Sequence, residues 1–173
     1  MNRKSSRYVT FMAMMVTLAL ILSYVETLVP AIPIPGAKIG LPNIVTLLVL
    51  SALGFADAIV VLILRTTIAS LLFTSVLSLA YSLSGGILSL IAMYLVIRLL
   101  KDRISIVATS LVGAVMHSVG QVLFAMAIVE SFGIVTILPL LILISILAGL
   151  ITGYAAKFML KHFKLLLAIK GTT

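Results

Sequence analysis

The sequence predicts an all-α integral membrane protein with six transmembrane helices, and three observations support this. Of its 173 residues, 63% are hydrophobic and only 9% are charged, whereas soluble domains are about half apolar and about a quarter charged. Uncharged stretches recur along the chain, and most match the length of one span, about 20 residues. The net charge is +8, and most of the Lys and Arg residues that produce it stand in short clusters. This composition excludes a soluble enzyme, a disordered chain and a fibrous repeat.

Each predicted helix has its own local justification. The first follows a basic start, but no small-residue cleavage pattern ends it, so it is a retained helix rather than a signal peptide. The second and sixth open with Leu41-Pro42 and Leu138-Pro139, where proline suits the first turn. The third and fourth share the uncharged stretch 66–97, and Ser82-Leu83-Ser84-Gly85-Gly86 is the predicted turn between them. The helices, within one transmembrane domain 1–173, are 8–29, 41–55, 58–80, 86–101, 104–129 and 135–162.

Charge placement decides between five and six spans and sets the orientation. With six spans and the N-terminus inside, ten of the twelve Lys and Arg residues face the cytoplasm, in agreement with the positive-inside bias. With five spans, the two later clusters would face outside. We therefore expect both termini in the cytoplasm and a multi-pass protein of the plasma membrane. The cytoplasmic residues are Arg3, Lys4, Arg7, Arg98, Lys101, Arg103, Lys157, Lys161, Lys164 and Lys170.

The first outer loop is rich in proline and carries one lysine, Lys38. Four prolines between positions 30 and 42 forbid a helix and favour a stiff, extended path. Glu26 ends the helix before this loop and Asn43 begins the helix after it. The loop is either a lid over a pocket or a rigid connector with an interfacial Glu–Lys pair, and both alternatives stay open.

Arg65 lies inside the predicted third helix, about 12 Å along the axis from Asp57. A central arginine costs about 2.5–3.5 kcal/mol on insertion scales. Its side chain either reaches back towards Asp57 and the cytoplasmic surface, or meets a buried partner, or contacts another subunit.

Gly149-xxx-Gly153 is a close-packing motif. A hydroxyl stripe with the same spacing, more typical of a packing surface than of a transport path, consists of Thr66, Ser70, Thr74 and Ser78.

His117 and Gln121 are the best candidates for contact with a polar ligand. They are four residues apart, so they share one face of the fifth helix. Gly113 lies one turn earlier and Gly120 is adjacent, and such small residues let a ligand or a neighbouring helix approach closely. Two polar groups on one face exceed what packing needs, which favours ligand contact slightly over an interhelical hydrogen bond.

The sequence contains no recognisable catalytic or metal-binding motif. Its two aspartates, Asp57 and Asp102, are far apart, whereas magnesium-bound pyrophosphate needs clustered carboxylates. There is no phosphate loop or nucleophile elbow, no cysteine, and no basic stripe with aromatics for nucleic acid. We therefore expect no catalytic residue, no metal site, no cofactor and no nucleic-acid partner. Energy for any transport must come from a gradient or from a partner.

Several motifs match a known pattern together. They are Glu26, Pro30-x-x-Pro33-x-Pro35-Gly36-x-Lys38-x-Gly40-Leu41-x-Asn43, Arg65, Ser82-Leu-Ser-Gly85-Gly86, Gly113-Ala114-x-x-His117-x-x-Gly120-Gln121 and Leu138-Pro139. In this combination the chain resembles, over nearly its whole length, the Gx transporter family, also known as heptaprenyl diphosphate synthase component I. That family is similar to the substrate-binding S components of energy-coupling-factor transporters.

The resemblance implies an S-component-like bundle with a substrate pocket towards the outer face, under the first loop. It also implies partners, namely a transmembrane coupling subunit and two cytoplasmic ATPases, besides a small-molecule substrate and membrane lipids. In S components, small residues of the first helix dock on the coupling subunit. The nearest matches here, Ala13-xxx-Thr17 and Ala19-xxx-Ser23, lack the full alanine pair. The expected substrate-binding residues are Glu26, Lys38, Asn43, His117 and Gln121.

Two functions of different classes follow. The first is a non-catalytic, substrate-binding membrane subunit of a small-molecule importer, indicated by the polar outer-half residues. The second is an accessory membrane subunit of prenyl diphosphate or quinone synthesis, or of flavin- and quinone-linked electron transfer. A structural scaffold is the remaining alternative, but it does not explain why Arg65 and His117 stand in apolar helices. The sequence does not identify the substrate.

Overall fold

The computed structural model describes residues 6–28 and 40–170, which form α-helices and short 3₁₀ turns and contain no strand. Five of these helices, all except α2, are long and apolar enough to cross a membrane. The predicted class, a multi-pass helical membrane protein, is therefore confirmed. The helices are α1 (Ser6–Leu28), α2 (Asn43–Ala52), α3 (Phe55–Phe73), α4 (Val76–Leu100), α5 (Ile106–Val129) and α6 (Leu138–Lys170).

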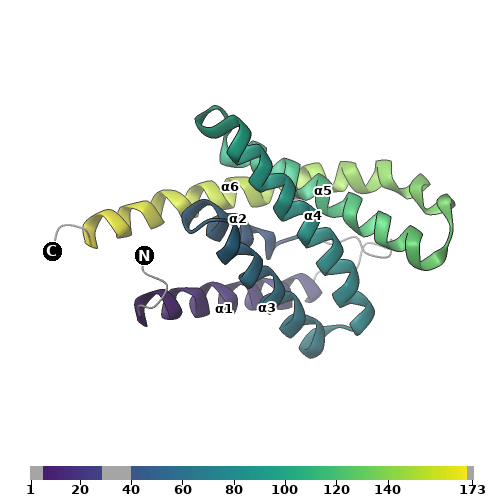
Figure 1. The fold of residues 1–173 in the computed structure, drawn as a ribbon, viewed down its shortest axis with the longest axis horizontal. Helices are drawn as coiled ribbons and strands as arrows, with labels where there is room; N and C mark the ends of the chain where they lie inside the picture. Colours follow the sequence, from purple (N-terminus) through teal and green to yellow (C-terminus); the bar gives the residue numbers. More distant parts are fainter. Residues whose placement is uncertain (1–5, 29–39, 171–173) are drawn as a thin grey trace.

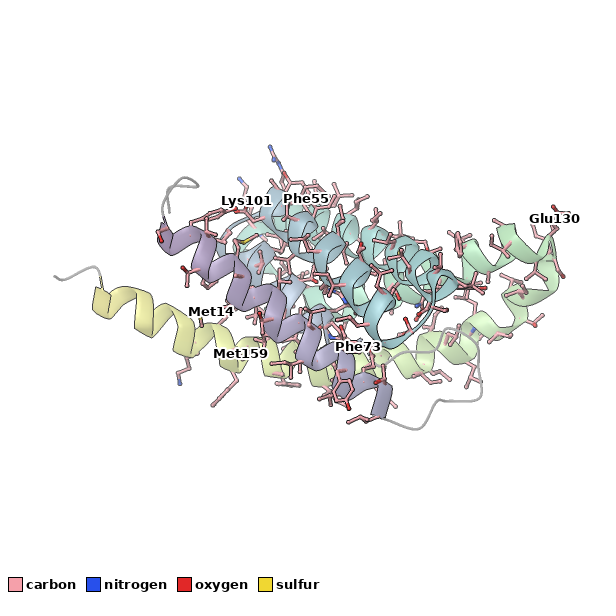
Figure 2. All side chains as sticks on the ribbon, turned by 90° about the horizontal axis from the view of Figure 1, so that it is seen from below. Met14, Phe55, Phe73, Lys101, Glu130 and Met159 are labelled. Carbon is pink, nitrogen blue, oxygen red and sulfur yellow. The ribbon has the colours of Figure 1, made fainter. Side chains whose placement is uncertain are left out.

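Successive helices run in alternating directions, so the start of α1 and the end of α6 lie at the same end of the bundle (Figure 1). Figure 2 places Lys101, in the 3₁₀ turn Lys101–Arg103, and Phe55 at one end and Glu130 at the tip of the α5–α6 hairpin at the other. The orientation was predicted by placing the Lys and Arg clusters on one side of the membrane, and Lys101 and Glu130 indeed lie at opposite ends of the bundle. Which end faces the cytoplasm stays a prediction.

The second helix is shorter than predicted. It has 10 residues instead of the 15 of 41–55, so it is about 15 Å long, half of a hydrocarbon core of about 30 Å. Every residue from Ile44 to Leu50 is buried, and α2 packs against α1, α3, α4 and α6. The predicted bounds 41–55 are therefore wrong for this helix, which is an enclosed half-length helix beside five long ones, and the count of six spans stays a prediction.

The turn between α3 and α4 lies at Thr74–Ser75 and not at Ser82–Gly86, which is inside α4. The Ser75 hydroxyl accepts a hydrogen bond from the Ser78 amide, so it caps α4. The prediction was wrong because the two glycines are packing residues. Both are buried, and a Cβ added to Gly86 would lie 2.6 Å from Leu62 Cδ1.

Glycines let α4, α5 and α6 approach at backbone distance. A Cβ on Gly120 of α5 would lie 2.9 Å from Gly85 Cα of α4. On α6, a Cβ on Gly149 would lie 3.0 Å from Leu111 Cα, and one on Gly153 would lie 2.9 Å from Val107 Cα. The close-packing role predicted for Gly149-xxx-Gly153 is confirmed, with α5 as the partner helix.

Candidate functional site

A cluster of polar residues joins the end of α1 and the start of α2 to the middle of α3. The Gly40 amide donates a hydrogen bond to the Glu26 carboxylate at the end of α1. Arg65 Nη2 of α3 donates to Asn43 Oδ1, at the start of α2, over 2.8 Å. The negative charge of Glu26 also acts on the Arg65 guanidinium. We call these four residues, Glu26, Gly40, Asn43 and Arg65, the polar cluster.

Arg65 has a buried partner, which was one of its three predicted alternatives. Its side chain is 6% exposed, and its hydrogen bond goes to Asn43. The alternative in which it reaches back towards Asp57 is wrong. Asp57 instead accepts a hydrogen bond of 2.8 Å from the Tyr8 hydroxyl, which ties α1 to the start of α3. The positive charge of Arg65 is therefore kept inside the bundle, where the negative charge of Glu26 acts on it.

The polar cluster lies at about half the depth of the bundle. Arg65 is ten residues after Phe55, which places it about 15 Å along α3. The start of α2 contacts Arg65 through Asn43, and α2 is itself about 15 Å long. Non-helical backbone at this depth is tolerated where it is enclosed by protein or lines a cavity. The turn Gly40–Pro42, which precedes α2, is at such a position.

A pocket opens beside the polar cluster, between α2, α4, α5 and α6. In this structure it has room for about one or two water molecules, so a larger ligand requires its walls to move. Its wall combines two members of the polar cluster with hydroxyls, one imidazole and small or apolar side chains. The lining residues of this hydroxyl pocket are Gly40, Asn43, Leu47, Ser89, Met93, Ser110, Gly113, Ala114, His117, Ser118, Ser145, Ala148 and Thr152.

His117 and Gln121 do share one buried face of α5, as predicted. They are 7% and 4% exposed, and both pack against Gly85 of α4, where an added Cβ would lie 3.1 Å from His117 Cε1 and 2.9 Å from Gln121 Cγ. His117 lines the hydroxyl pocket, whereas Gln121 lies one turn further along and is not part of the wall described here. Ligand contact by either residue stays a prediction.

Lys38 and most of the predicted lid, the loop from residue 30 to residue 42, fall within residues 29–39, outside the described part of the chain, so both stay predictions. Ala13 and Thr17 are exposed on α1, and the Thr17 hydroxyl donates to the Ala13 carbonyl over 2.9 Å. Ala19 is fully buried. Of the two predicted docking pairs on the first helix, only Ala13-xxx-Thr17 therefore faces outward, where a partner subunit can reach it.

The sequence did not point to the five hydroxyl side chains in the pocket wall. Ser110 Oγ and Thr152 Oγ1 lie 2.9 Å apart across the α5–α6 contact, and the hydroxyls of Ser118 and Ser145 form a second such pair. The spacing in the sequence could have indicated this face, because Ser145 and Thr152 are seven residues apart and so lie on the same side of α6. The predicted stripe on α3 is shorter than expected, since α3 ends at Phe73.

Some buried polar atoms near the site have no hydrogen-bond partner among the described residues. Ser89 Oγ, in the pocket wall, belongs to a side chain that is 1% exposed. Arg65 Nε and Gln121 Nε2 are also buried atoms without a hydrogen-bond partner among the described residues. Because an unsatisfied buried donor costs about 1–3 kcal/mol, such a group in a cavity wall is a candidate contact for a ligand or for water.

Comparison with known proteins identifies one family. The model of a family described as heptaprenyl diphosphate synthase component I matches residues 15–159. The matched range includes all four residues of the polar cluster and all described lining residues of the hydroxyl pocket. No curated protein and no solved structure matches the chain.

Proposed function

The chain belongs to the family described as heptaprenyl diphosphate synthase component I, and we propose that it is the substrate-binding membrane subunit of a small-molecule importer. The observation that supports this most is the polar cluster, with its buried Arg65, beside the hydroxyl pocket. Arginine, carboxylate and amide groups at half the depth of an apolar bundle are costly, and helix packing alone needs far fewer of them. Half-length helices that end beside a mid-membrane pocket are a recurring feature of transporter binding sites.

In this proposal each residue has a distinct role. His117 and Asn43 contact the ligand from the pocket wall, Gln121 supports the same face of α5, and Glu26 and Lys38 act at the entrance. The ligand enters from the outer face under the loop at 29–39. The energy comes from a transmembrane coupling subunit and two cytoplasmic ATPases, as the similarity to S components implies, and the outward pair Ala13 and Thr17 is the docking candidate.

The family description favours a second function, an accessory membrane subunit of prenyl diphosphate synthesis. Affinity capture of the tagged chain from native membranes, in mild detergent, separates the two functions. Recovery of a membrane coupling subunit with ATPases supports the importer. Recovery of a soluble prenyltransferase or a flavoprotein, without ATPases, supports the accessory role and contradicts the importer.

The pocket itself is tested by replacing His117 with alanine. We expect small molecules that co-purify with the wild-type protein, measured by extraction and mass spectrometry, to be lost from His117→Ala while the protein stays folded. Ser70→Ala is the matched control, because Ser70 is also buried but lies on α3, outside the pocket wall. Unchanged ligand content in His117→Ala means that His117 only serves helix packing.

A further inference from the structure

The charge of the pocket wall restricts the chemistry of its ligand. No Asp, Glu, Lys or Arg stands among the described lining residues. The two charged side chains of the polar cluster lie behind lining residues, because Arg65 contacts Asn43 and Glu26 contacts Gly40, and their charges are opposite. With His117 neutral, a ligand with a net charge would lose its hydration without meeting an opposite charge among the described lining residues, which costs several kcal/mol. An uncharged ligand avoids this cost.

Arg65 fixes which way the Asn43 amide points. A guanidinium can only donate hydrogen bonds, so the Asn43 atom that it contacts at 2.8 Å must be the carbonyl oxygen. The NH₂ group of the same amide is then left on the other side. Asn43 itself lines the hydroxyl pocket. Arg65 is thus a positioning residue, which makes Asn43 a hydrogen-bond donor at the pocket wall.

Gly40 keeps the space beside this donor open. It has φ +78°, and a Cβ added to it would lie 3.2 Å from Asn43 Nδ2. A side chain there would both strain the backbone and crowd the amide nitrogen. The Glu26 carboxylate holds the Gly40 amide from the far side. The polar cluster therefore holds the Asn43 NH₂ group at the start of α2, beside a backbone turn that leaves room next to it.

Ser89 supplies a second group to the same pocket. Its hydroxyl is buried and has no partner within the described residues, whereas the paired hydroxyls on α5 and α6 satisfy each other. Met93 lies beside it, since an added Cβ on Gly113 would lie 2.6 Å from Met93 Sδ and 3.1 Å from Ser89 Oγ. A methionine side chain adapts its shape readily, so the wall next to Ser89 is able to yield to a ligand.

We propose that the hydroxyl pocket selects an uncharged small molecule, and that it holds a carbonyl or hydroxyl oxygen of this molecule with the Asn43 amide and the Ser89 hydroxyl. This inference rests on the proposed function, because it names the class of substrate for the same site. It predicts that carboxylates, phosphates and cationic amines bind this pocket less well than an uncharged molecule.

Cysteine labelling tests the proposal directly, since the chain contains no cysteine. Ser89→Cys on α4, and Ser145→Cys on α6, are reacted in membranes with three methanethiosulfonates: uncharged methyl, anionic sulfonatoethyl and cationic trimethylammonioethyl. Thr136→Cys is the control, because Thr136 is exposed in the turn before α6. Rates in the pocket variants are divided by the control rate for each reagent, and folding is checked by gel filtration.

We expect the uncharged reagent to modify Ser89→Cys at least about tenfold faster than either charged reagent, after this correction. Adding Asn43→Asp to Ser89→Cys is expected to shift the preference towards the cationic reagent, because Asn43 borders the same space. A preference for the anionic reagent in Ser89→Cys overturns the uncharged class but leaves a binding function intact. If no reagent reacts with Ser89→Cys while Thr136→Cys reacts, the hydroxyl pocket is a packing void. This result overturns both the uncharged class of ligand and the proposed binding function.

Discussion

Removing the positive charge of Arg65 probes the polar cluster most sharply. Arg65→Met keeps most of the apolar stem but deletes the hydrogen bond to Asn43 and the charge opposite Glu26. The cost of removing one of two interacting opposite charges inside a protein reaches about 3–5 kcal/mol when they form a direct buried ion pair. Glu26 is only partly buried, so it regains some hydration. We therefore expect a loss of unfolding free energy near the lower limit, about 3 kcal/mol.

The assay is thermal unfolding of the detergent-solubilised protein. For a chain of this size, 1 kcal/mol corresponds to about 2–4 °C in Tm, so Arg65→Met should lower Tm by about 6–12 °C. Arg103→Met is the matched control, because Arg103 is exposed at the end of the bundle, and its Tm should stay within about 2 °C of the wild type.

A double-mutant cycle with Glu26→Gln isolates the pair itself. Glutamine retains an acceptor for the Gly40 amide but removes the charge, so Arg65→Met in that background should cost about 1–2 kcal/mol less than it does alone. If the two changes add to within about 0.5 kcal/mol, the charges of Glu26 and Arg65 are not coupled. The reasoning about a balanced, enclosed pair would then be refuted.

Three further predictions concern how the helices are held together. Gly85→Ala should lower stability by about 1–3 kcal/mol in thermal unfolding, because its Cβ would lie 2.7 Å from a backbone oxygen of α5, whereas exposed Gly133→Ala should have no effect. Tyr8→Phe should cost about 1–3 kcal/mol, since it leaves buried Asp57 without this donor. Ser75→Ala should cost about 1 kcal/mol by uncapping α4. Wild-type Tm values in these variants would contradict the contacts described.

The sequence predicted the helical class and most helix positions because charges and apolar length are one-dimensional signals. It failed at Ser82–Gly86 because glycine and serine serve turns and tight helix contacts equally well, and only the facing helix decides. Here Gly120 and Leu62 face the two glycines, and the true boundary is the modest cap at Ser75.

The candidate site was predictable residue by residue but not as an arrangement. Asn43, Arg65 and His117 stood out because polar groups in apolar helices are costly. The pairing of Arg65 with Asn43 was not visible, since it depends on how far α2 enters the bundle, and that depends on contacts with four other helices. The hydroxyls of Ser89 and Ser145 were overlooked for the same reason, because serine alone does not reveal which face of a helix is buried.

Native mass spectrometry of the intact protein, released from mild detergent, tests the central claim most directly. The account predicts one small, uncharged molecule bound per chain in the wild-type protein, and its loss from Asn43→Asp with the fold retained. A protein that is folded but carries no adduct, also after exposure to a cell extract, would contradict a substrate-binding role for the hydroxyl pocket.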